Sequence, residues 1–265
     1  MTVAEAVGKN AMTVTRCAFG HELASEIPAL ASGEIAAVRI SGVVDPEIAS
    51  TVARQLQTLE EKSSYRNFSH METIGLSYFE AVDREREESY FSNAKPVMER
   101  LRSVFAPASL PTDVIRTTLD EAWPAGLMTM RHPSGKPMRP CLARTIVHGS
   151  ELAPHVDRCD WYGHADFSVP YAQMSGNIYL SVGDDGGELM VWNSQPDHPA
   201  NSDICECSVE PDLGKPDLIL APEPGEMILI NSRFTHAVNK VVGLRSTLSF
   251  FLVLHSRDGP LFMYH

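Results

Sequence analysis

Apolar side chains in the first half of the chain recur at intervals of three or four residues. Over residues 45–62 they form one stripe. Asp45 followed by Pro46 is typical of a helix start, because Asp is favoured at the N-cap and Pro at the first helical position. The spacing therefore predicts an amphipathic helix with one buried face. The same pattern predicts helices over residues 93–105 and 112–126, and a short strand over residues 34–43.

After residue 126 the pattern changes to short runs of β-branched and aromatic residues, separated by Gly, Pro, Asn and Asp. Several short runs at such spacing are typical of a β-sandwich or barrel. We therefore expect an α+β protein in which helices pack on the outside of a sheet core. The predicted strands cover residues 141–149, 176–183, 187–193, 217–225, 226–232 and 246–256.

Two of these predicted strands are polar on one face and apolar on the other, because side chains alternate along a strand. The pattern alone leaves two interpretations open. One is an antiparallel sheet with one face in water. The other is a barrel whose apolar outside meets the helices and whose polar inside holds a ligand. The apolar faces carry Ile178, Leu180 and Val182, and Leu248, Phe250 and Leu252; the polar faces carry Asn177, Tyr179 and Ser181, and Arg245, Thr247 and Ser249.

The charge balance is acidic, with 34 acidic and 22 basic side chains among 265 residues and a formal net charge of −12. We find no basic stripe, which argues against a nucleic acid or an anionic membrane as partner. There is no apolar run of about eighteen residues and no signal-peptide pattern at the start. We therefore expect a cytoplasmic protein that acts on a small molecule, and a homodimer is compatible with the sequence. The close pair Cys205 and Cys207 favours free thiols over a zinc site, which needs four ligands.

Two potential metal ligands lie close together in the segment "PHVD". His155 and Asp157 are two residues apart, so in an extended segment both side chains point the same way. A third candidate, His236, follows the predicted strand over residues 226–232. Two histidines and one carboxylate form the ligand set that suits non-haem Fe(II) and leaves coordination positions open. One carboxylate leaves such a centre positively charged, which favours an anionic chelating co-substrate.

Arg245 follows His236 by nine residues, and Thr247 shares its strand face. A guanidinium binds a carboxylate through two charge-assisted hydrogen bonds, and Thr247 can add a third donor. This chemistry fits 2-oxoglutarate, whose 2-oxo acid end would chelate iron while its distal carboxylate reaches Arg245 and one iron position remains for O2. Asn177 and Tyr179 would line the same pocket. The polar strand faces then have a ligand to hold, which favours the barrel.

Four stretches in the second half of the chain carry a resemblance to a known enzyme family: "HVD", "GGELMVWN", "PGEMILINSRFTHAVNKVVGLRST" and "FFLVLHSRDGPLFMYH". They are similar to the Fe(II)/2-oxoglutarate-dependent oxygenases, which have a double-stranded β-helix core of jelly-roll or cupin-like architecture. The chain resembles in particular the N-substituted L-amino-acid hydroxylases and the freestanding aliphatic halogenases that chlorinate indole alkaloids. The resemblance covers residues 126–265 well and residues 1–125 more loosely.

This resemblance implies one structural unit, with a catalytic core over residues 126–265 and a helical portion over residues 1–125 packed on its outside. The helical portion includes a candidate lid over residues 70–90. Arg144 is implied to face the co-substrate pocket. Substrate contacts are implied for Gly75, Leu152, Asp160, Trp161 and Ser175.

Asp157 separates two reactions within the families that the chain resembles. The halogenases carry Gly or Ala at this position, which frees a site on iron for chloride. The carboxylate here therefore implies hydroxylation of an unactivated C–H bond, or another two-electron oxidation such as desaturation. The resemblance suggests an amino acid, an N-modified amino acid or a natural-product intermediate as substrate.

A protein of another class remains as the alternative, namely a non-catalytic cupin-like module that binds a small ligand. Arg245 and Thr247 distinguish the two, because such a module has no reason to place them just after a third metal ligand. His148 and His164 flank the metal motif, and we predict that both lie outside the ligand set.

Overall fold

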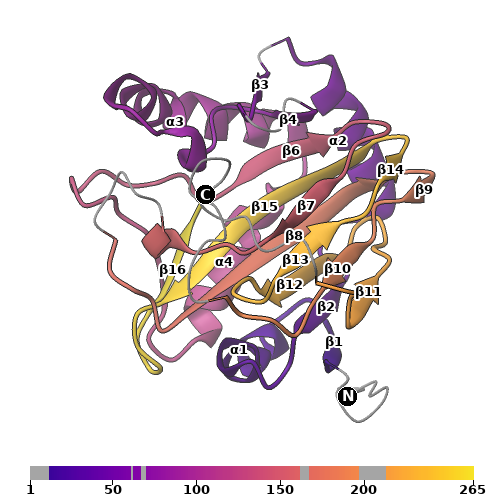
Figure 1. Cartoon of the computed structure of the whole chain (residues 1–265). Coiled ribbons are helices and arrows are strands. Elements are labelled where there is room, and N and C mark those ends of the chain that lie inside the picture. Colours follow the sequence, from indigo (N-terminus) through magenta and orange to yellow (C-terminus); the bar gives the residue numbers. More distant parts are fainter. Residues whose placement is uncertain (1–11, 61, 67–69, 162–166, 197–212) are drawn as a thin grey trace.

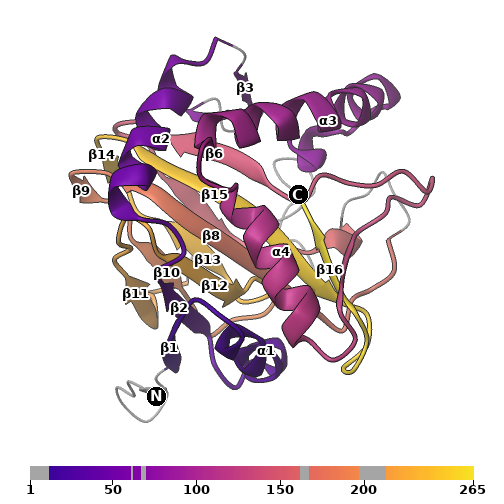
Figure 2. The same cartoon turned by 180° about the vertical axis from the view of Figure 1, so that it is seen from behind.

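The computed structural model describes residues 12–60, 62–66, 70–161, 167–196 and 213–265. It consists of a ten-stranded sheet with helices on one face and a four-stranded sheet on the other (Figure 1). Seen from behind, helices α2 (Pro46–Thr58) and α4 (Pro111–Ala122) lie across the large sheet (Figure 2). No helix in the described ranges combines the length and apolar character needed to cross a membrane.

The large sheet combines strands from both halves of the chain. Its order is β1 (Val14–Ala18), β2 (Ala37–Ser41), β12 (Met227–Asn231), β8 (Ala172–Val182), β15 (Arg245–Leu254), β6 (Leu142–Ile146), β4 (Met71–Thr73) and β3 (Ser63–Ser64), with β16 (Leu261–Tyr264) beside β15 and β5 (Leu127–Thr129) beside β16. The small sheet contains β11 (Leu218–Leu220), β10 (Leu189–Val191), β13 (His236–Val238) and β7 (Leu152–His155), while β14 (Val241–Val242) pairs with β9 (Asp185–Gly186).

The three predicted helices are present. α2 begins at Pro46, and the Asp45 carboxylate accepts a hydrogen bond of 2.8 Å from the Glu47 N–H, as the N-cap pattern predicts. α3 (Arg84–Phe105) begins nine residues before the predicted start at residue 93, capped by Asp83. α1 (Glu22–Ser32) is a helix that the sequence pattern does not predict. It contains Pro28 in its interior, and it buries Leu23, Ala24, Ile27 and Leu30.

The apolar faces of the central strands meet the helices, as the barrel interpretation predicts. Ile178 and Leu180 of β8, with Leu248, Phe250 and Leu252 of β15, belong to one core with side chains of α1, α2, α3 and α4. The polar faces are buried as well, since Tyr179, Thr247 and Ser249 are at most 1% exposed. A sheet with one face in water is therefore excluded.

The prediction that Val182 shares the apolar face of Ile178 and Leu180 is wrong. The register between β8 and β15 shifts between Ser246 and Thr247, so the alternation of side chains breaks there. Val182 packs against the cluster that contains Tyr179 and Leu189, on the side of the small sheet.

A buried ion pair links the N-terminal strands to the rest of the large sheet. The Arg39 guanidinium on β2 binds the Glu226 carboxylate through hydrogen bonds of 3.0 and 2.6 Å, and both residues are buried. Arg39→Ala would leave a buried carboxylate without its cation, so we expect the free energy of unfolding to fall by about 3 to 5 kcal/mol. Denaturant unfolding measures this loss.

The matched control is Arg84→Ala, because Arg84 pairs with Glu88 in solvent on α3. This variant should unfold like the wild type. A loss of stability in Arg39→Ala no larger than that in Arg84→Ala would show that the buried pair does not stabilise the sheet.

Candidate metal centre

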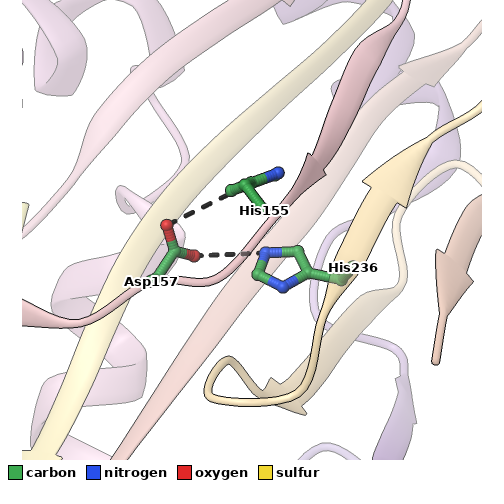
Figure 3. Close-up of side chains that lie close together, drawn as sticks. All are labelled: His155, Asp157 and His236. Carbon is green, nitrogen blue, oxygen red and sulfur yellow. Dashed lines mark ion pairs between the residues drawn. The ribbon is translucent and has the colours of Figure 1, made fainter. Parts of the chain in front are cut away.

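The pairing of β7 with β13 sets His155 opposite His236 in the small sheet. The two imidazole rings lie 4.2 Å apart between centroids, and the Asp157 carboxylate directs one oxygen at each ring (Figure 3). The distances are 3.3 Å from Asp157 Oδ2 to His236 Nε2 and 4.0 Å from Asp157 Oδ1 to His155 Nε2. One ligand atom from each residue lies within 4.8 Å of the other two. The structure thus brings the three predicted ligands together.

Backbone carbonyls orient both histidines. His155 Nδ1 donates to the Ala153 carbonyl at 2.8 Å, and His236 Nδ1 donates to the Phe234 carbonyl at 2.9 Å. Because a carbonyl only accepts, Nδ1 must carry the proton, and the Nε2 lone pair is left for a metal.

The segment after β7 is tied to the end of β12. The Asp157 N–H donates to the Ser232 carbonyl at 2.9 Å, and the Ser232 hydroxyl donates to the Asp157 carbonyl at 3.4 Å. These contacts hold the Asp157 backbone in place beside the two histidines.

The protonation states of the ligands suit a divalent cation. Burial and the neighbouring His236 ring lower the pKa of His155 to about 4, although Asp157 opposes the shift. Burial raises the pKa of Asp157, but His236, His155 and Arg144 outweigh it and lower the pKa to about 2. At neutral pH His155 is therefore neutral and Asp157 is a carboxylate, which are the forms that bind metal. Two imidazole nitrogens and one carboxylate oxygen fit Fe(II) with open positions.

Arg245 is a buried cation without a carboxylate partner in the described ranges. It is 4% exposed, its Nη2 donates to the Tyr179 hydroxyl at 3.3 Å, and its guanidinium lies 4.9 Å from the centre of the Tyr179 ring. Its Nε is buried and has no hydrogen-bond partner among the residues that the structure describes. Burial lowers the pKa of Arg245, but an arginine remains protonated in proteins. The site therefore fits an anion such as the distal carboxylate of 2-oxoglutarate.

The other predicted co-substrate residues lie on adjacent strands. Thr247 of β15 pairs with Tyr179 of β8 on one side and with Arg144 of β6 on the other. Arg144 Nη2 donates to Asn177 Oδ1 at 2.7 Å. The positive charge of Arg144 acts on His155, Asp157 and Arg245, so Arg144 lies within electrostatic reach of both the metal ligands and the buried cation.

Two of the predicted substrate residues lie on strands next to these groups. Leu152 begins β7 and is half-buried, while Ser175 on β8 is buried and pairs with Phe251 of β15.

The other three predicted substrate residues have different surroundings. Asp160 is engaged by Arg158 through hydrogen bonds of 2.7 and 3.3 Å. Trp161 ends the short helix η2 (Cys159–Trp161), and its side chain lies outside the described part of the structure. Gly75 has a φ of +84°, and a Cβ there would collide with Arg139 and Val97, so local packing requires glycine.

Of the two flanking histidines, His148 is exposed, and its Nδ1 accepts a hydrogen bond from the Gly243 N–H, so it lies outside the ligand set as predicted. His164 lies outside the described residues, as do Cys205 and Cys207.

Sequence reasoning missed His265, which is 3% exposed. The charges of Arg144, Arg139 and Asp157 act on its ring. No local spacing links residue 265 to the metal motif, because the pairing of β16 with β15 brings it there.

Comparisons with known proteins agree with the class of enzyme that the sequence predicts. A family model described as carrier-protein-independent halogenase WelO5 matches residues 17–265. No curated protein matches the chain. Among solved structures, an N-substituted L-amino acid dioxygenase from Burkholderia ambifaria AMMD is 18% identical, with a TM-score of 0.64 over 92% of this chain and 91% of that one.

Two further solved structures show the same fold. The structure of an N-substituted L-amino acid dioxygenase from Burkholderia ambifaria AMMD in complex with alpha-KG is 20% identical, with a TM-score of 0.57 over 92% of this chain and 91% of that one. The non-heme alpha-ketoglutarate-dependent epimerase SnoN from nogalamycin biosynthesis is 13% identical, with a TM-score of 0.50 over 88% and 86%. Together with the His155, Asp157 and His236 cluster, the family match confirms the predicted class of enzyme. The chain belongs to the family of the carrier-protein-independent halogenase WelO5, among the Fe(II)/2-oxoglutarate-dependent oxygenases.

Proposed function

We propose that the protein hydroxylates an unactivated C–H bond of a small molecule and converts 2-oxoglutarate to succinate and CO2. The observation that carries this proposal is Asp157, whose carboxylate lies 3.3 Å from His236 Nε2 and 4.0 Å from His155 Nε2. The halogenases that the chain resembles have Gly or Ala here, which leaves an iron position for chloride. A carboxylate in that position favours hydroxylation, although the family takes its name from a halogenase.

Each residue of the site has a role in this proposal. His155, Asp157 and His236 hold Fe(II), and Arg245 with Thr247 holds the distal carboxylate of 2-oxoglutarate. Arg144, Asn177 and Tyr179 line the co-substrate pocket. Bound iron supplies the activation of O2, coupled to oxidative decarboxylation of the co-substrate. The chain itself orients the ligands through the Ala153 and Phe234 carbonyls and keeps a buried cation ready for the co-substrate.

The proposed architecture is a double-stranded β-helix in which the large and small sheets enclose the site. The support is that His155 and His236 lie on the small sheet, with Asp157 just after β7, while the co-substrate residues lie on the facing side of the large sheet. As substrate we propose an amino acid, an N-modified amino acid or a natural-product intermediate, in line with the dioxygenase of similar fold.

The test has two stages. Anaerobic addition of Fe(II) and 2-oxoglutarate should produce a visible charge-transfer band, which reports the chelate. In air and with chloride present, succinate release is then screened across amino acids and their N-acyl derivatives, and the product mass is measured. We expect the gain of one oxygen atom. A chlorinated product, or loss of two hydrogens in desaturation, would contradict hydroxylation while leaving the iron site intact.

Loss of a residue that only hydrogen-bonds a metal ligand weakens metal binding by roughly ten- to hundredfold. Asp157 is proposed to bind the metal directly, so we expect Asp157→Gly to weaken Fe(II) binding in chloride-free buffer by more than that. Added chloride should restore part of the affinity, because a halide can supply the missing negative charge at the vacated position. Anaerobic iron titrations with and without chloride measure both effects. The Fe(II) affinity of the wild type should not change with chloride. If Asp157→Gly binds Fe(II) as tightly as the wild type does and its affinity does not change with chloride either, Asp157 is not a metal ligand.

A further inference from the structure

His265 lies at a junction of strands beside the metal centre. β8 pairs along the whole of β15 on one edge, so β6 and β16 share the other edge, end to end. Tyr264 ends β16 opposite Phe251, and His265 comes next. Its N–H donates to the Arg139 carbonyl at 2.6 Å, and its own carbonyl accepts a hydrogen bond of 2.5 Å from the Tyr90 hydroxyl. The backbone of His265 is therefore held on both sides.

The ring of His265 lies on the inner side of the large sheet. Its centre is 5.2 Å from that of the Phe251 ring, with 31° between the planes. Phe251 pairs with Ser175 of β8, and residues opposite each other in neighbouring strands share a face. Ser175 is one of the predicted substrate residues, and the Asp157 carboxylate is near enough to act on the His265 ring. The ring thus stacks on a side chain that shares the Ser175 face of the large sheet, within electrostatic reach of the metal ligand Asp157.

Neither ring nitrogen of His265 has a hydrogen-bond partner among the residues that the structure describes, although both are buried. Burial, together with the charges of Arg144 and Arg139, holds the pKa of His265 well below its usual range, so the ring is neutral. A neutral imidazole has one N–H donor and one acceptor nitrogen. Buried polar atoms are nearly always paired, and exceptions occur where a ligand or catalytic partner completes them. The Nδ1 atoms of His155 and His236, in contrast, are paired with carbonyls.

We propose that His265 is a substrate-binding residue whose ring exchanges hydrogen bonds with an uncharged amide group of the bound substrate. An amide offers one acceptor and one donor, which matches a neutral imidazole, whereas the arginines of the site serve carboxylates. This inference rests on the proposed function and narrows its substrate class to amide-bearing molecules such as N-acyl amino acids. Among the described residues, neither nitrogen of the His265 ring forms a hydrogen bond that stabilises the fold.

The test is a binding experiment on the anaerobic Fe(II) and 2-oxoglutarate complex. The probes are the N-acetyl derivatives of L-leucine, L-valine and L-phenylalanine, and the readout is the change that each causes in the charge-transfer band. His265→Phe retains a ring without nitrogens, and His265→Gln retains one donor and one acceptor. We expect the Kd of the tightest probe to rise about tenfold or more in His265→Phe and to recover in part in His265→Gln.

Three controls separate recognition from structure. The affinity for 2-oxoglutarate should match that of the wild type in both variants, which a folding defect would not allow. His255→Phe replaces an exposed histidine that contacts Ser168 and Phe262, and it should leave probe binding unaltered. If His265→Phe does not fold, His265→Leu provides the same comparison.

Two results would overturn the inference. One is a His265→Phe enzyme that binds the tightest probe as well as the wild type does. The other is a wild-type enzyme that forms the band and yet responds to none of the three N-acetyl probes. Absence of the band from the wild type is a different result, because it overturns the proposed function itself.

Discussion

Replacing His236 with alanine is expected to abolish Fe(II) binding and oxygenase activity. His236 lies across from His155 in the small sheet, and its Nε2 is 3.3 Å from Asp157 Oδ2, so its loss removes one of the three clustered ligands. Two protein ligands then remain of the three that suit non-haem iron. Iron content after anaerobic loading, the charge-transfer band with 2-oxoglutarate and succinate release should all fall below detection.

His148→Ala is the matched control for this loss. His148 precedes the metal motif and is exposed, and its Nδ1 accepts a hydrogen bond from the Gly243 N–H. Its removal should leave iron content and the band as in the wild type. Circular dichroism establishes that both variants are folded. A folded His236→Ala enzyme that still retains one iron per chain and the band would refute the metal assignment.

Two of the three metal ligands could be predicted from short-range geometry. His155 and Asp157 are two residues apart in an extended segment, and alternation along a strand brings such side chains to one side. His236 was predicted from its place after a strand and from the chemistry of the ligand set. The register that sets it opposite His155 belongs to the pairing of β7 with β13, which no local pattern reveals.

The misses share a physical reason, which is that they depend on contacts between distant segments. Val182 changes face because β8 and β15 shift register, and a shift is a property of two strands together. His265 reaches the site through the pairing of β16 with β15. Asp160 is not one of these misses: it stays a predicted substrate residue, and its carboxylate accepts hydrogen bonds from Arg158, two residues earlier.

Arg245→Ala is expected to raise the KM for 2-oxoglutarate by about ten- to a hundredfold, which corresponds to roughly 1.5 to 3 kcal/mol for a lost hydrogen bond to a charged group. The reason is that Arg245 is 4% exposed and that, among the described residues, the Tyr179 hydroxyl is the one hydrogen-bond partner of its guanidinium. Steady-state succinate release at varied 2-oxoglutarate measures the change. Arg245→Lys retains the charge without the planar fork, so we expect it to recover only part of the affinity.

The stability of the ligand-free protein distinguishes binding from support of the fold. A buried guanidinium without a carboxylate partner costs free energy in the folded state, so Arg245→Ala should unfold at the same denaturant concentration as the wild type or at a higher one. Arg39→Ala should do the opposite, because Arg39 is paired with the buried Glu226. An Arg245→Ala enzyme with an unaltered KM for 2-oxoglutarate would remove Arg245 from co-substrate binding. Lower stability together with a normal KM would instead assign Arg245 to the core that it forms with Tyr179.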